Sequence, residues 1–130
     1  MKAYYDNKPS KFEAVGNGSV LYRYNIKEEN APAAQQQEEG EAPRTQWACE
    51  EVTVWEPLSR RKVVATVIAD RWAQSHEQKL VNEYNSVALG VITGEEAETV
   101  KAAYSAFLAE RRMLKAAVEA DCDERGLPED

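Results

Sequence analysis

Hydrophobic and polar positions follow two different periods along this chain. Up to about Trp55, aromatic and β-branched residues alternate with polar ones, as in a strand with one buried face. From about Ser59, apolar residues recur at intervals of three and four, as on one face of a helix. The change of period predicts an α+β fold, with a three-stranded antiparallel N-terminal sheet followed by two or three helices, of which the last is the longest.

Three strands are predicted in the sheet part, residues 11–56. Phe12–Val15 and Ser19–Lys27 flank Gly16-Asn17-Gly18, and Asn-Gly supplies the positive φ angles of a tight hairpin turn. The third strand, Gln46–Trp55, is expected to pair antiparallel to the second. In the second strand one face is expected to carry Val20, Tyr22, Tyr24 and Ile26, and the other Leu21, Arg23 and Asn25.

The segment between the second and third strands, 28–45, is rich in Glu, Gln, Ala and Pro and has almost nothing to bury. Such a composition is typical of a flexible acidic loop. A docking strip that becomes ordered on binding is the alternative interpretation of this loop.

The helical part, 59–121, begins after Pro57, with Ser59 as a helix N-cap. Residues 62–68 favour a short helix, although their Val, Thr and Ile content leaves a fourth strand open. Ser75-His76-Glu77-Gln78 has the pattern of a capping box and predicts a helix from His76 to Leu89. A second capping box, Thr93-Gly94-Glu95-Glu96, opens the last helix, which is expected to end near Asp121.

The length of 130 residues has room for one modest core, so a single domain is expected over 1–122, with a solvated tail over 123–130. The formal net charge of -7 disfavours nucleic acid as a partner, because binding to phosphates depends on basic surfaces. No apolar run is long enough for a signal peptide or a membrane span, which predicts a protein of the cytoplasm or of an assembly built there. Cys49 and Cys122 lack metal-ligand spacing and are expected to be free thiols within the fold.

Candidate catalytic groups are sparse. His76 is the only histidine, and it occupies an ordinary position in the first turn of a helix. Glu50 and Glu51 point to opposite faces of one strand and so cannot act as an acid/base pair. An enzyme would need these groups to converge with Asp70 or Tyr84 in one pocket. We therefore predict no catalytic residue, no metal ligand and no cofactor.

Residues suited to binding proteins form two groups. Some aromatic side chains of the sheet could lie on an exposed face, although pairing across strands or packing under the helices would bury them. The last helix repeats apolar residues every seven positions, which approximates a coiled-coil seam interrupted by Arg111 and Asp121. Self-association through this helix and packing within the fold are both left open. The candidate protein-binding residues are Tyr22, Tyr24, Trp47, Trp55, Tyr104, Phe107, Arg111 and Leu114.

Three runs of sequence carry a resemblance. They are Ile68-Ala-Asp-Arg-Trp72, Glu77-Gln-Lys-Leu-Val-Asn-Glu-Tyr-Asn85 and Tyr104-Ser-Ala-Phe-Leu-Ala-Glu-Arg111. Together they resemble uncharacterised small proteins of gut Bacteroides phages and prophages, over about 62–122. The resemblance implies a setting near virion or tail-fibre genes and carries over no functional residue.

The sequence therefore predicts a non-catalytic phage-type accessory or structural protein that binds other proteins, either of the virion or of the host. The alternative is a host-directed inhibitor or regulatory module whose acidic surface covers a basic partner. Neither a nucleic acid nor a membrane is expected as a partner, and a homo-oligomer remains open.

Overall fold

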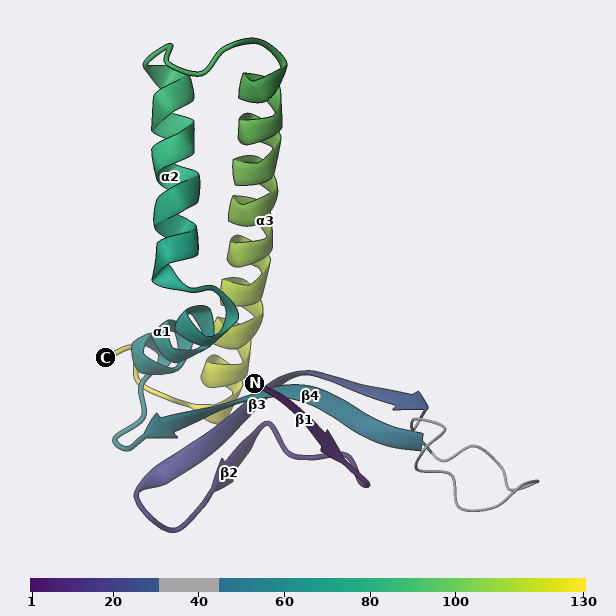
Figure 1. Cartoon of the computed structure of the whole chain (residues 1–130). Coiled ribbons are helices and arrows are strands. Elements are labelled where there is room, and N and C mark those ends of the chain that lie inside the picture. Colours follow the sequence, from purple (N-terminus) through teal and green to yellow (C-terminus); the bar gives the residue numbers. More distant parts are fainter. Residues whose placement is uncertain (31–44) are drawn as a thin grey trace, which may run out of the picture. The chain divides into compact units, whose positions relative to one another are not determined.

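The structure is a computed structural model that describes residues 1–30 and 45–130. It has the predicted α+β class, with a four-stranded antiparallel sheet followed by three helices, the last of which is the longest (Figure 1). The chain divides into two compact units, 1–58 and 59–130. We call them the sheet unit and the helical unit, and we describe each by itself.

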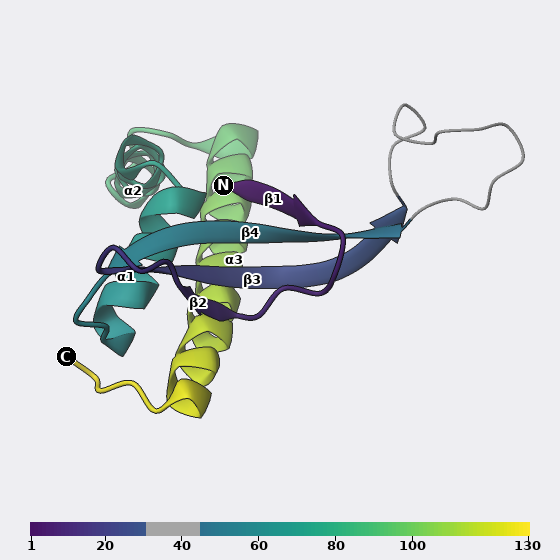
Figure 2. The same ribbon diagram turned by 90° about the horizontal axis from the view of Figure 1, so that it is seen from below.

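The sheet unit contains β1 (Lys2–Tyr5), β2 (Phe12–Ala14), β3 (Ser19–Asn30) and β4 (Thr45–Trp55). Their order across the sheet is β1-β4-β3-β2, which places the two long strands in the centre and the two short ones at the edges (Figure 2). One face of β3 and β4 is apolar and buried, as the alternating pattern predicted. Its buried apolar residues are Val20, Tyr22, Tyr24, Ala48, Val52 and Val54.

The predicted hairpin between β2 and β3 is confirmed, with Phe12 opposite Tyr22. Its turn differs from the one we expected, because Gly16 (φ 92°) and Gly18 (φ 88°) adopt the positive φ angles and Asn17 does not. The side chain of Asn17 instead accepts a hydrogen bond from the backbone N–H of Ser19 at 3.1 Å. The glycines on both sides of the asparagine thus make the reversal.

A β-bulge corrects the predicted alternation in β3. The pairing of Tyr24 with Glu50 and of Lys27 with Ala48 leaves one extra residue on β3, and Asn25 there has a φ of 53°. Lys27 therefore takes the face of Tyr24, where we had predicted Ile26. The strand continues to Asn30, three residues into the predicted loop. The rest of that loop, 31–44, lies outside the described residues.

A fourth strand exists, although at the N-terminus instead of at 62–68. The edge strand β1 pairs with β4 from Lys2 opposite Glu50 to Tyr5 opposite Trp47. Four residues with little apolar alternation give no strand signal of their own, so this strand depends on its long neighbour.

The helical unit contains α1 (Arg60–Arg71), α2 (Gln74–Ala88) and α3 (Gly94–Arg125). Residues 62–68 lie in α1, which confirms the helix, and the side-chain oxygen of Ser59 caps it by accepting from Lys62 N–H at 3.1 Å. A helix is favoured here because the spacing of four places both Val63 and Val67 on its buried side.

Only one of the two predicted capping boxes has its N-cap at the expected residue. The one at Ser75 is wrong, because α2 begins at Gln74 and Ala73 is the N-cap. Thr93 is the N-cap of α3 as predicted, but among the described residues its side chain makes no capping hydrogen bond. The last helix also continues past Asp121 to Arg125, where Gly126 with φ 79° ends it.

A cluster of large apolar side chains from all three helices forms the centre of the helical unit. Trp72 and Phe107 meet edge to face, with ring centroids 5.3 Å apart. The buried members are Ile68, Trp72, Leu80 and Phe107, and Val64, Tyr104 and Leu114 pack partly buried against them. The seven-residue repeat of α3 thus serves the interior of its own unit.

Candidate functional site

An open groove of about 760 Å³ lies between the helices of the helical unit. Its floor comes mainly from α1, where Ala65 and Ala69 are exposed and Val64 is half-buried. Ile68 and Trp72 belong both to the groove and to the apolar cluster beneath it. The floor is therefore apolar and shallow, and small side chains give access to it.

Charged side chains surround this floor in equal numbers of each sign. The basic ones are Arg60, Arg61, Arg111 and Lys115, and the acidic ones are Glu77, Glu119, Glu129 and Asp130. Each basic group has an acidic partner within the rim, as in the contact between Arg111 Nε and Glu77 Oε1 at 3.4 Å and that between Arg61 Nη1 and Asp130 Oδ1 at 3.1 Å. Because the rim is charged and the floor apolar, the groove has the layout of a protein-binding surface.

The segment after α3 closes one end of the groove. The carbonyl oxygens of Pro128 and Glu129 accept hydrogen bonds from the backbone N–H groups of Arg60 and Arg61, at 2.8 and 3.1 Å. These donors belong to the first turn of α1, which has no acceptors of its own for them. We had expected a solvated tail over 123–130. Residues 123–125 instead belong to α3, and Pro128 and Glu129 are hydrogen-bonded to α1.

Carboxylates at the end of α3 and in the segment after it also contact the arginines at the start of α1. Arg60 forms ion pairs with Asp123 and with Glu129, each at 3.3 Å. Two arginines at the start of α1 oppose the dipole of the helix, and these carboxylates offset that effect. The chain itself thus supplies acidic partners for these two arginines.

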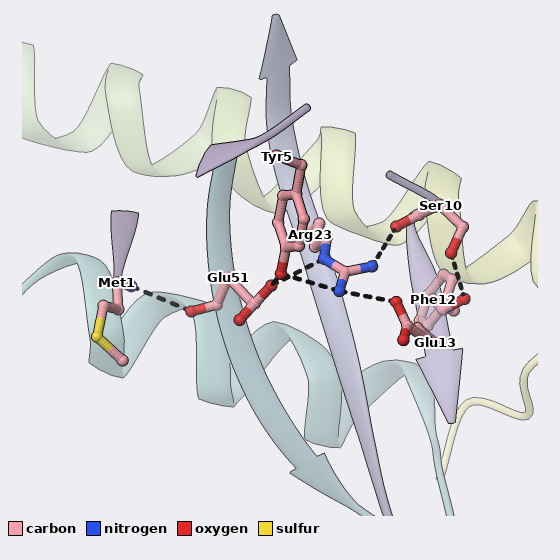
Figure 3. Close-up of polar contacts among 7 residues, drawn as sticks. All are labelled: Met1, Tyr5, Ser10, Phe12, Glu13, Arg23 and Glu51. Carbon is pink, nitrogen blue, oxygen red and sulfur yellow. Dashed lines mark hydrogen bonds and ion pairs between the residues drawn. The ribbon is translucent and has the colours of Figure 1, made fainter. Parts of the chain in front are cut away.

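The sheet unit contains a second polar centre, around Arg23 (Figure 3). The side chain of Arg23 is only 2% exposed and contacts residues from each of the other three strands. Its Nε lies 2.8 Å from Glu51 Oε2, and its Nη2 lies 2.8 Å from Glu13 Oε1 and 3.0 Å from the Tyr5 hydroxyl. Its Nη1 donates to the carbonyl of Ser10 at 3.2 Å, so the buried cation is well supplied with acceptors.

The ionisation states of this centre are fixed by its contacts. Burial alone would raise the pKa of Glu51, but the hydrogen bonds donated by Tyr5 and Arg23 outweigh it and lower the pKa of this carboxyl. The hydrogen bond to Glu51 raises the pKa of Tyr5, which keeps the hydroxyl protonated. Burial opposes the charge of Arg23, yet hydrogen bonds to Glu51 and Glu13 raise its pKa. The centre holds a stable pattern of charges that ties the four strands together.

The predicted binding residues of the sheet are found in different environments. Tyr22 and Tyr24 are buried, with rings stacked 6.0 Å apart, and Trp47 is half-buried beneath the ammonium group of Lys8. Only Trp55 of the four is largely exposed, at 57%. Of these four aromatic side chains, that of Trp55 thus has the largest exposed fraction.

The predicted binding residues of the last helix lie in the helical unit. Phe107 is buried, Tyr104 and Leu114 pack against the same cluster, and Arg111 lies on the rim of the groove. Of this group, Arg111 alone lines the groove. The floor residues Ala65 and Ala69 were not singled out, because an alanine on an exposed helix face carries no signal of a site.

The groups named for a hypothetical enzyme have separate surroundings. Tyr84 packs against Tyr104 at 5.0 Å, and exposed His76 lies with its ring 6.0 Å from that of Phe107. Glu50 and Glu51 lie on opposite faces of β4, as predicted. Within residues 1–30 and 45–130, no three His, Cys, Asp or Glu side chains come close enough together to hold a metal ion.

Cys49 and Cys122 are free and buried, as predicted. Burial raises the pKa of both thiols, that of Cys122 to about 11, which keeps them protonated and unreactive. In the part of the chain that the structure describes, no helix is both long and apolar enough to cross a membrane.

Comparison with known proteins adds no relationship. The chain matches no protein family, no curated protein and no solved structure. The resemblance to phage proteins therefore stays a prediction, and function has to be argued from the geometry of the chain itself.

Proposed function

We propose that this chain is a non-catalytic accessory or structural protein that acts by binding another protein, and that the groove of the helical unit is its binding surface. The observation that carries this proposal is the combination of an exposed, small-residue floor with a rim of paired charges. A virion component is the kind of partner that the resemblance to phage proteins favours.

The composition of the groove supports this proposal. Interfaces between proteins place apolar residues at the centre and polar ones at the rim, and tryptophan and arginine contribute most often to binding energy. Trp72 lies at the floor of the groove and Arg111 on its rim. The ionisable rim groups are held in ion pairs, an arrangement suited to recognising a charged surface.

The alternative function, an inhibitor with an acidic surface, has less support. It rested on the acidic loop and on the acidic tail. Residues 31–44 of the loop lie outside the described residues, and the tail carboxylates of Glu129 and Asp130 contact the chain's own Arg60 and Arg61.

Selection of peptides from a random phage-displayed library against the immobilised chain tests the proposal. The affinities of the selected peptides are then measured for the unaltered chain and for two variants. Ala69→Arg fills the floor of the groove from an exposed position, and Met113→Ser changes a side chain that is 74% exposed and does not line the groove. We expect Ala69→Arg to weaken binding by about tenfold or more and Met113→Ser to leave it unchanged.

Two results would contradict the proposal. One is a selection that enriches no binding peptide. The other is a set of peptides that bind the Ala69→Arg variant as well as they bind the unaltered chain. Circular dichroism of both variants verifies that the helices are intact.

A further inference from the structure

The turn between α2 and α3 exposes apolar side chains. Leu89 is 80% exposed and Val91 is 75% exposed. The turn itself is held by hydrogen bonds, since the N–H groups of Val91 and Ile92 both donate to the carbonyl of Ser86, at 2.8 and 3.2 Å. We call Leu89 and Val91 the tip. Leu89 and Val91 together form an exposed apolar patch, and such patches occur at contact surfaces.

The tip has acidic neighbours. Glu95 and Glu96 lie in the first turn of α3, immediately after it, and the last turn of α2, residues 85–88, carries no basic side chain. A surface that receives the tip therefore needs an apolar floor and basic groups beside it.

The groove offers both features within the same unit. Ala65 and Ala69 leave room on its floor, and Arg60 and Arg61 stand at its rim. The pair formed by Arg61 and Asp130 joins side chains that are 81% and 72% exposed. Exposed pairs of this kind contribute little to stability because water screens them, so other carboxylates can replace Asp130.

We propose that the tip of one copy docks into the groove of a second copy. Leu89 and Val91 would cover Ala65 and Ala69, and the carboxylates of Glu95 and Glu96 would exchange with those of the tail at the arginines. This inference rests on the proposed function, because it uses the same groove and names its occupant.

A chain cannot fill its own groove in this way. Gln74 and Glu77, at the start of α2, line the groove, whereas the tip follows the last residue of that helix. A helix of 15 residues is about 22 Å long, and Figure 1 shows α1 and the turn between α2 and α3 at opposite ends of the α2–α3 pair. The contact therefore joins two copies through two different surfaces. Two reciprocal contacts close a dimer, and successive contacts build a ring or a filament.

Two complementary variants test this contact. In the tip variant, Leu89→Ser and Val91→Ser remove the apolar surface. In the groove variant, Ala69→Glu blocks the floor and repels the acidic tip. All three positions are exposed, so the fold should tolerate the changes. Light scattering on a size-exclusion column gives the mass of each species over a series of concentrations.

We expect the mass of the unaltered chain to rise with concentration, while each variant alone stays a monomer. An equimolar mixture of the two variants retains one intact tip and one intact groove and should stop at a heterodimer. The matched control, Met113→Ser, should assemble like the unaltered chain. A monomeric unaltered chain, or a mixture that forms no heterodimer, would overturn the proposal.

Charge neutralisation of the tail provides a second measurement. The double change Glu129→Gln and Asp130→Asn removes the carboxylates that compete for Arg60 and Arg61. Self-association should then become about two- to fivefold tighter, and weaker association would contradict the exchange of carboxylates. If the groove binds selected peptides but never a second copy, this inference fails while the proposed function stands.

Discussion

The two units of this molecule place their charges in opposite ways. The sheet unit has an arginine at its polar centre, 2% exposed and in contact with Glu51, Glu13 and Tyr5. The helical unit has an apolar cluster at its centre and has its ion pairs at the surface, several of them at the rim of the groove. One unit thus uses charge inside the fold, and the other uses it at the surface.

The difference separates two uses of an ion pair. A buried pair adds little net stability compared with apolar residues of the same size, but removal of one partner leaves the other uncompensated and is costly. Exposed pairs cost little to break and can be exchanged for pairs with another molecule. The charges of the sheet unit therefore fix the pairing of its strands, and those of the helical unit remain available for recognition.

The largest effect is expected from Arg23→Ala. The change leaves the carboxylate of Glu51 without its main partner. It also removes the side chain that contacts Glu13 of β2 and Glu51 of β4 at the same time. Loss of one partner of a buried pair costs about 3–5 kcal/mol. Urea unfolding measures the total, and hydrogen exchange of the amides in β3 and β4 assigns the loss to the sheet. A loss below about 1 kcal/mol would show that the buried pair behaves like an exposed one.

A slightly smaller effect is expected from Leu80→Ala in the helical unit. Leu80 is 9% exposed and belongs to the apolar cluster, so its truncation removes buried surface and leaves a cavity. We expect a loss of about 2–3 kcal/mol, at the low end for such a change because the site is near the surface of the cluster. Hydrogen exchange should show the loss in α2 and α3. Exposed Leu108→Ala, at 45% exposure, is the matched control and should cost clearly less.

The next prediction concerns acid. The pKa of Glu51 is lower in the folded state than its ordinary value of 4.5, so its contribution to stability is complete above that value. The contribution is lost as the pH falls through the lower, folded pKa. Glu51→Gln removes this titration, and its unfolding free energy should fall less steeply between neutral pH and about pH 3. Urea unfolding at each pH measures this slope. Equal slopes of the unfolding free energy against pH in the two proteins would contradict the lowered pKa of Glu51.

The sequence predicted the parts of this fold that depend on local pattern. Alternation placed Arg23 on the face opposite Tyr22, and the spacing of Val63 and Val67 indicated a helix, both correctly. Tyr5 could not be connected with Arg23 in advance, because β1 owes its existence to pairing with β4. Long-range pairing of this kind leaves no periodic signal in four residues.

The groove was beyond prediction for a similar reason. It depends on the hydrogen bonds that Pro128 and Glu129 accept from the start of α1. Because these partners lie 60 or more positions away in the sequence, the charged residues of the tail were expected to be solvated. Exposed alanines also give no sequence signal of a groove, since nothing in the sequence distinguishes Ala69 from any other alanine on a helix surface. The apolar periodicity predicted only the amphipathic helix α1 and the face of that helix that is buried.

The smallest effect is expected at an exposed pair of the helical unit. Arg71 Nη2 lies 2.7 Å from Glu110 Oε1, closer than Arg23 lies to Glu51, but the side chains are 45% and 56% exposed. If distance governed the energy, a double-mutant cycle of Arg71→Ala and Glu110→Ala would give the larger coupling. Because water screens this pair, we expect only about 0.2–1 kcal/mol, against a clearly larger coupling between Arg23 and Glu51. Equal couplings in the two cycles, measured by urea unfolding, would show that burial does not separate the two units in the way proposed here.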